Sequence, residues 1–92
     1  MDMDSEHLTL VISTVSTVTL AVTNADNVVV HMRSGTGPVY YTLDGSTPTV
    51  AGDATYVVYS ALPARSHPIT TTDAPVVKLI SATADAVSVE AF

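Results

Sequence analysis

The stretch VSTVTLAVTNADNVVVHMR, residues 15–33, decides the fold class of this chain. Apolar side chains recur at every second position on both sides of a polar segment at 23–27. They are Val18, Leu20, Val22, Val28, Val30 and Met32. A period of two places alternate side chains on opposite faces of a β-strand, whereas a helix has a period of about 3.6. The stretch therefore predicts two strands that are joined by a turn and packed on a core through one face.

The same alternation recurs over most of the remaining chain. Runs rich in Val, Ile, Thr and Tyr are separated by clusters of Gly, Pro, Asn and Asp, at the spacing of about 8–12 residues that is typical of a sandwich or barrel. The ranges that we expect as strands are Leu8–Ser13, Val15–Val22, Val28–Arg33, Val39–Leu43, Tyr56–Ser60, His67–Thr71, Val76–Ser81 and Val87–Ala91. The first two ranges form either separate strands or one long bent strand. The predicted fold is all-β with seven or eight strands, a small antiparallel β-sandwich that is Ig-like or barrel-like.

The length of 92 residues predicts a single domain, which we place at residues 8–92. Residues 1–7 are acidic at their start and are expected to form a flexible N-terminal arm. Pro63 and Pro68 bracket a section that is not expected to be a central strand, because proline has no N–H for the hydrogen-bond ladder.

The charge balance excludes several classes of partner. The formal net charge is −6, and Lys and Arg together number only 3. A nucleic-acid-binding face needs clustered cations that neutralise phosphates, and anionic membrane surfaces attract basic segments, so neither partner is expected. The chain has no cysteine, which excludes a disulfide framework, a thiolate zinc site and a cysteine nucleophile.

No motif in the sequence indicates catalysis. The three histidines lie in separate segments without the spacing of a metal site, and the Gly-x-Ser-x-Gly turn of serine hydrolases is absent. Asp44-Gly45-Ser46-Thr47 has oxygen-bearing side chains but lacks the closing glutamate of a calcium loop, so a turn is the favoured interpretation. We therefore expect a structural or binding module that is not an enzyme and has no cofactor or metal.

The candidate interface or glycan contacts are aromatic, cationic or histidine side chains near turns. They are Tyr40, Tyr56, Tyr59, Arg65 and His67. Tyrosine combines an apolar ring with a polar hydroxyl, which suits a protein interface or stacking on a sugar. Tyr40-Tyr41 places one ring on each face of its strand, so packing in the core is the competing interpretation for these rings.

Two resemblances bear on function. The run YYTLDGSTPT at 40–49 resembles a hairpin of the small β-sandwich modules appended to chitobiase-like glycosidases, where the module is accessory and carries no catalysis. The ordered series of 14–22, 27–33, 40–53, 76–81 and 88–90 is similar to short virion proteins of tailed bacteriophages that infect actinobacteria, which serve as capsid decoration or minor structural proteins.

The phage resemblance implies a protein that is made in the host cytoplasm and decorates the outer capsid surface of the virion. Its partners would be the major capsid protein and copies of itself, with a trimer expected by analogy. The alternative is a carbohydrate-binding accessory module that contacts host-surface polysaccharide, although the absence of Trp disfavours it. A third interpretation is an Ig-like adhesion domain that belongs to a longer protein.

Overall fold

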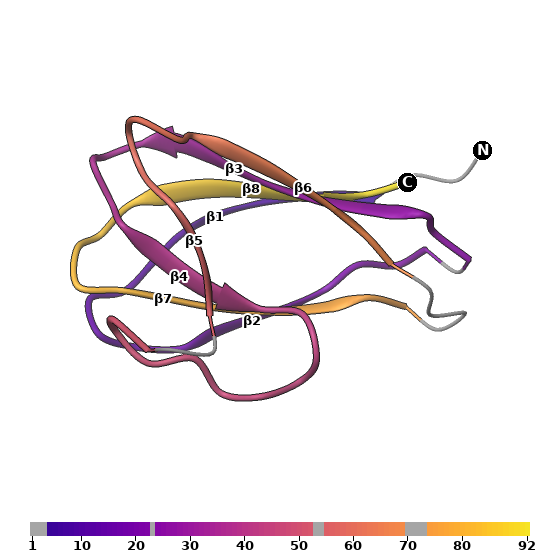
Figure 1. Ribbon diagram of the computed structural model, residues 1–92, viewed down its shortest axis with the longest axis horizontal. Helices are drawn as coiled ribbons and strands as arrows, with labels where there is room; N and C mark the ends of the chain where they lie inside the picture. Colours follow the sequence, from indigo (N-terminus) through magenta and orange to yellow (C-terminus); the bar gives the residue numbers. More distant parts are fainter. Residues whose placement is uncertain (1–3, 23, 53–54, 70–73) are drawn as a thin grey trace.

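The computed structural model describes residues 4–22, 24–52, 55–69 and 74–92, which form eight strands in two antiparallel sheets (Figure 1). The first sheet has the order β1-β8-β3-β6, with bounds β1 Asp4–Thr9, β8 Ala86–Ala91, β3 Asn27–Ser34 and β6 Ala64–Pro68. The second sheet has the order β2-β7-β4-β5, with bounds β2 Ser16–Thr19, β7 Val76–Ser81, β4 Val39–Thr42 and β5 Tyr56–Val58. The predicted all-β sandwich is confirmed. The described residues contain no helix long and apolar enough to cross a membrane.

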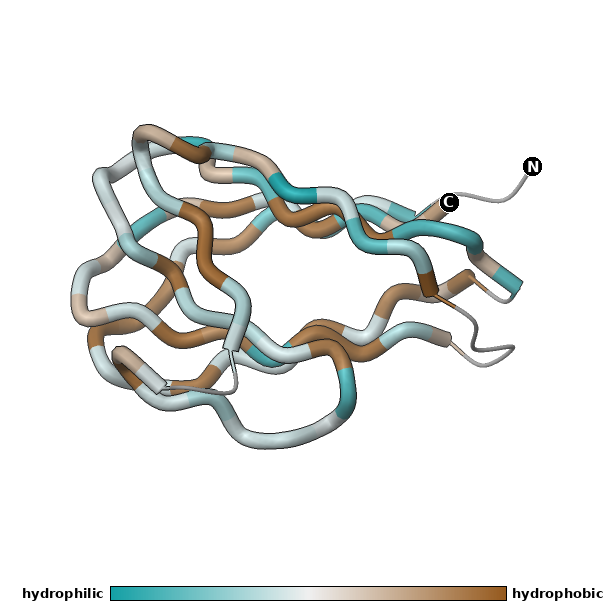
Figure 2. The backbone as a smooth tube through the Cα atoms, in the orientation of Figure 1, coloured by the Kyte–Doolittle hydropathy of each residue, from teal (hydrophilic) through white to brown (hydrophobic). Residues whose placement is uncertain are grey.

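The core lies between the two sheets and is formed by the alternating apolar positions. Val28, Val30 and Met32 of β3 are buried, whereas His31 and Arg33 are exposed on the other face. Figure 2 shows hydrophobic and hydrophilic segments alternating along the strands. The largest fully buried side chains come from both sheets and the segments beside them, and they are Tyr41, Leu10, Leu20, Leu79, Val28, Val30, Val39, Val58, Val77, Val87, Val89 and Pro48. Burial of this apolar surface is the main term that favours the folded chain.

Strand β6 corrects the expected position of the sixth strand. The sequence predicts a strand at His67–Thr71, but the observed strand starts earlier, and residues 70 and 71 lie outside the described residues. β6 pairs only with β3, so Pro68 stands on an edge strand, as proline requires. The flanking prolines exclude a central strand but not an edge strand, which explains the misplaced boundary.

Strand β1 corrects the predicted arm. Residues 4–7, which we expect to be flexible, pair with β8 in a continuous register from Asp4↔Ala91 to Thr9↔Ala86, while residues 1–3 lie outside the described residues. The Asp4 carboxylate also accepts a hydrogen bond of 2.7 Å from the backbone N–H of Ala21, just after β2. This carboxylate holds the strand to the second sheet, a role that hydropathy does not reveal.

The β1–β8 pairing also buries a polar residue of β8. Ser88 lies on the face that we expect to be polar, yet only 4% of its surface is exposed. The side chain of His7 lies opposite it, and His7 Nδ1 and Ser88 Oγ share a hydrogen bond of 2.7 Å. A buried hydroxyl is stable here because it has a partner.

The sandwich has two open sides, each bordered by two edge strands. On one side, the Asp4 side chain links β1 to the residues that follow β2. On the other side, β5 and β6 meet through the rings of Tyr56 and His67, whose centroids are 4.3 Å apart. The β1 and β2 runs are therefore separate strands in different sheets, which decides between the two interpretations of residues 8–22.

Candidate binding surface

Three aromatic side chains close the gap between the sheets on the β5–β6 side. Tyr41 of β4 stands opposite Tyr56 of β5, and His67 of β6 stands opposite the core residue Val28, so all three side chains point inward. The ring centroids are 5.7 Å apart for Tyr41 and Tyr56, 5.4 Å for Tyr41 and His67, and 4.3 Å for Tyr56 and His67. Tilted and edge-on contacts at these distances are favourable for aromatic rings. We call Tyr41, Tyr56, His67 and the adjacent Arg65 the aromatic seam.

The inner part of the aromatic seam is a buried polar pair. His67 Nε2 and the Tyr41 hydroxyl share a hydrogen bond of 2.5 Å, and the two residues are 7% and 0% exposed. Burial lowers the pKa of His67, and the nearby Arg65 charge lowers it further. Burial also raises the pKa of Tyr41 well above its ordinary value. Both groups are therefore neutral near pH 7, and one donates the proton that the other accepts.

The outer part of the aromatic seam is open to solvent. The Tyr56 side chain is 42% exposed, and the guanidinium carbon of Arg65 lies 5.5 Å from its ring centroid. This is the geometry of a cation–π contact. Tyrosine and arginine are also the residues most enriched at the energetic centres of protein interfaces. The exposed rim can therefore present a ring and a cation together.

Three of the five residues singled out in the sequence meet at this seam, and two do not. Tyr56, Arg65 and His67 come together, whereas Tyr40 is half-buried on the opposite face of β4. Tyr59 is 39% exposed and lies beyond β5, where its backbone pairs with Leu62 through hydrogen bonds of 3.1 and 2.9 Å. The sequence missed Tyr41 as a member, although the Tyr40-Tyr41 pair predicts that one of the two rings is internal.

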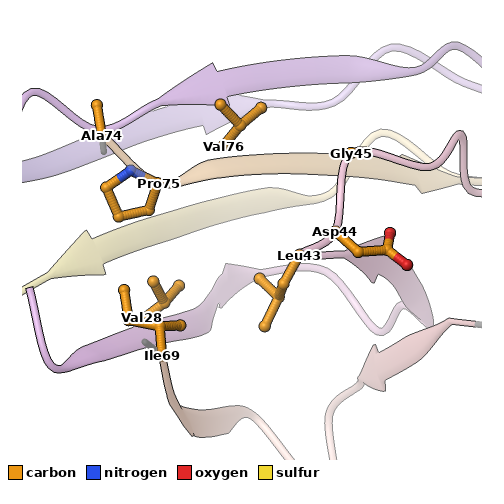
Figure 3. A pocket seen from close by; sticks show the side chains of 8 residues that line it. All are labelled: Val28, Leu43, Asp44, Gly45, Ile69, Ala74, Pro75 and Val76. Atoms are coloured by element: carbon orange, nitrogen blue, oxygen red, sulfur yellow. The ribbon is translucent and has the colours of Figure 1, made fainter. Parts of the chain in front are cut away.

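A cavity of about 280 Å³ lies beside the start of β7 and next to the aromatic seam, since its lining includes Val28, the cross-strand partner of His67 (Figure 3). Its lining is mainly apolar and consists of Val28, Leu43, Asp44, Gly45, Ile69, Ala74, Pro75 and Val76. Asp44 Oδ1 accepts hydrogen bonds from Ser46 N at 3.0 Å and Ser46 Oγ at 2.5 Å. These bonds from Ser46 lower the pKa of Asp44. The carboxylate thus shapes its own turn, as the turn interpretation of Asp44–Thr47 predicts.

A second polar cluster ties β7 to β8. Asp85 is 2% exposed, and its carboxylate accepts hydrogen bonds from Ser81 Oγ at 2.7 Å, Thr83 Oγ1 at 2.6 Å and Gly37 N at 3.2 Å. Burial acts to raise the pKa of Asp85, but these hydrogen bonds outweigh it and the pKa is lowered. Among the described residues, no group of three His, Asp or Glu side chains is placed to hold a metal ion. The cluster therefore stabilises the connection between β7 and β8 and links it to Gly37.

Residues 12–91 match the family described as the chitobiase/beta-hexosaminidase C-terminal domain. The chain belongs to this family. The match spans β2 to β8, and β1 lies before it. The resemblance of residues 40–49 to chitobiase-associated modules is therefore confirmed and extends over most of the chain.

One solved structure shows the same fold in a different setting. A chain from Bacillus endospore appendages, described as a novel family of disulfide-linked pili, superposes with a TM-score of 0.56 and is 20% identical. The likeness covers 98% of this chain and 84% of that chain, and at this identity it shows the fold alone. None of the curated proteins matches the chain. Membership of an accessory-domain family and this shared fold fit a structural or binding module.

Proposed function

We propose that this chain is a non-enzymatic structural module that attaches to a larger protein assembly, namely the outer surface of a tailed-phage capsid. The observation that carries the proposal is the placement of the polar groups. The buried ones, Tyr41 with His67 and Ser81 with Asp85, are engaged with each other, and the described residues leave no buried side-chain N or O without a partner. A catalytic site needs polar groups that are aimed at a substrate.

The exposed apolar side chains support attachment instead. The large hydrophobic side chains that stand out from the surface are Val11, Ile12, Val50, Tyr56, Tyr59 and Leu62, with exposures from 39% to 62%. Tyr56 belongs to the aromatic seam, and Tyr59 and Leu62 follow it closely along the chain. Clusters of exposed apolar and aromatic residues mark interaction sites on small proteins. We infer that the seam and the adjoining residues 59–62 contact the assembly.

Charge and relatedness support the same proposal. A net charge of −6 suits an outer surface and disfavours a position against packaged DNA. The likeness to a pilus chain indicates that a sandwich of this kind serves in a large assembly, although this chain has no cysteine for a disulfide link. The capsid itself rests on the sequence resemblance to virion proteins of actinobacteriophages.

Co-sedimentation tests the proposal. Purified chain is mixed at micromolar concentration with heads of a tailed actinobacteriophage assembled without a decoration protein. We expect it to sediment with the heads, and we expect Tyr56→Ala to weaken that binding at least tenfold. Tyr40→Ala, which changes the opposite face of the second sheet, is the matched control and should bind like the unmodified chain. A chain that stays in the supernatant contradicts the capsid assignment.

A second candidate function is carbohydrate binding, and the exposed Tyr56 ring beside Arg65 favours it. A ring of this kind can stack on a sugar while a guanidinium donates hydrogen bonds to its oxygens. Titration with host cell-wall polysaccharide separates the two functions. Saccharide binding that is abolished by Tyr56→Ala would establish this candidate, and no heat of binding at millimolar polysaccharide would exclude it.

A further inference from the structure

The first sheet ends in two long edge strands that differ from those of the second sheet. β1 and β6 have 6 and 5 residues, whereas β2 and β5 have 4 and 3. β1 contains no proline and keeps an unbroken register with β8. An edge strand presents unpaired backbone groups to any strand that can align with it. β1 and β6 are therefore the two places where the sheet can be extended.

The direction of the two strands suits extension by a second copy. β1 is antiparallel to β8, β8 to β3 and β3 to β6, so β1 and β6 run in opposite directions within one chain. A second copy placed beside the first in the same orientation presents its β1 antiparallel to β6. The inner faces of both copies then lie on the same side of the joined sheet. No reorientation is needed to form an antiparallel ladder.

The backbone groups at the two edges also match. Leu10 N donates to Asp85 O at 2.8 Å, so the even-numbered residues of β1 face β8, and Ser5, His7 and Thr9 direct their backbone outward. Ile69 N donates to Asp26 O at 2.9 Å, so the odd-numbered residues of β6 face β3, and Ala64 and Ser66 direct theirs outward. Pairing of His7 with Ala64 joins outward-facing backbone groups of both edges, and pairing of Ser5 with Ser66 replaces the 3.1 Å bond from Ser5 N–H to Asp4 Oδ1.

This register brings two opposite charges together. Glu6 of β1 lies opposite Val89 of β8, and Arg65 of β6 lies opposite Val30 of β3. Val89 and Val30 are buried in the core, so the Glu6 and Arg65 side chains also project from the inner face, each at its own edge of the sheet. When Ser5 pairs with Ser66, Glu6 stands directly across from Arg65 of the neighbouring copy. An inward-pointing charge on an edge strand opposes pairing with a neutral strand. An opposite charge directly across the ladder removes that penalty.

We propose that copies of this chain associate head to tail, with β1 of one copy added to β6 of the next and Glu6 paired with Arg65. Pairing of β1 with β1 would bring the acidic Asp4 and Glu6 of two copies together, and pairing of β6 with β6 would bring two Arg65 side chains together. The charges thus select the heterologous contact over both symmetric ones. Such a contact closes into a ring, a trimer being the smallest, or continues as a filament.

The contact is small, so the association is weak. One strand pair with its flanks falls in the class of interfaces below about 1,200 Å² of total buried area. The inference goes beyond the proposed attachment to a capsid and is measured on the free chain, without heads. A result that contradicts self-association would therefore not contradict capsid attachment, and the reverse also holds.

Amide hydrogen exchange gives the first test and needs no variant. In a single copy the Ser5 N–H donates to Asp4 Oδ1 at 3.1 Å, so the test uses the N–H groups of His7, Ala64 and Ser66, which face solvent. We expect their exchange to slow at least tenfold between 20 µM and 1 mM chain, while the exposed amide of Gly45 in the β4–β5 loop is unchanged. Exchange rates of these three amides that do not depend on concentration overturn the proposal.

Charge reversal gives the second test, read by sedimentation velocity over the same concentrations. Glu6→Arg and Arg65→Glu should each reduce association at least tenfold, because each places like charges across the ladder. Mixing the two variants should restore it, since each contact between the two different variants joins opposite charges. Arg33→Glu makes the same change of net charge as Arg65→Glu, but on the internal strand β3, and should associate like the unmodified chain. A single species of monomer mass at 1 mM, or variants that associate normally, would overturn the head-to-tail contact.

Discussion

The Tyr41→Phe substitution is expected to destabilise the chain by removing one buried hydroxyl. The ring stays in place, so no large cavity opens, but His67 Nε2 loses its partner at 2.5 Å in a site where the imidazole is only 7% exposed. A buried polar group without a partner costs about 1–3 kcal/mol. We therefore expect the free energy of unfolding to fall by about 2 kcal/mol. For a domain of this size that corresponds to a decrease in Tm of roughly 8–16 °C.

Urea unfolding followed by circular dichroism measures this change. The midpoint should fall while the m-value stays constant, because the same surface is exposed on unfolding. Tyr40→Phe is the matched control, since it removes a hydroxyl from the neighbouring residue on the half-buried outer face. We expect it to change stability by less than about 0.5 kcal/mol. Equal effects of the two substitutions would refute the role of the Tyr41–His67 hydrogen bond.

Three further predictions concern the same two polar clusters and one turn. Burial lowers the pKa of His67 below its unfolded value of 6.5, so below pH 6.5 the unfolded chain binds more protons than the folded chain. The free energy of unfolding should therefore decrease as the pH is lowered from 7 to 5. Chemical denaturation at each pH checks this, and His67→Gln should flatten the profile. Gly35→Ala should cost more than Gly45→Ala in thermal unfolding, since both have positive φ (95° and 86°) but only at Gly35 would a Cβ meet Asp85 Oδ1, at 2.0 Å. Asp85→Ala should lower the free energy of unfolding, measured in urea, by about 1–3 kcal/mol, because the buried Ser81 hydroxyl loses its acceptor. A smaller loss than for Tyr40→Phe would contradict the stabilising role of the Asp85 hydrogen bonds.

The strands that the sequence predicts best are those with one apolar and one polar face. Val76–Ser81 is observed as predicted, and Asn27–Ser34 extends the predicted Val28–Arg33 by one residue at each end. Periodicity succeeds there because both strands are internal, and β3 buries alternate side chains while β7 does so up to Leu79. It fails for residues 4–7, where Asp4 and Glu6 occupy inner positions at the open edge, so that their charges reach solvent or a backbone N–H.

The aromatic seam could be predicted only in part. Aromatic residues near turns are typical contact residues, and that rule selects Tyr56, Arg65 and His67. It does not reveal that Tyr41 and His67, which are 26 residues apart, meet across the two sheets. Such a contact depends on strand order, and local residue pattern does not specify which strands become neighbours.

The pairing of Asp4 with Ala91 places the first and last strands side by side, with the start of β1 and the end of β8 at one end of the sandwich (Figure 1). The opposite end of the sandwich holds the β1–β2 connection with the exposed Val11 and Ile12. Force applied to the two ends would open the β1–β8 ladder one hydrogen bond at a time, because antiparallel neighbours unzip where the load enters. A peptide or fluorophore attached before β1 or after β8 would start from the end of the sandwich where these two strands meet, and the β1–β2 connection at the opposite end would stay uncovered.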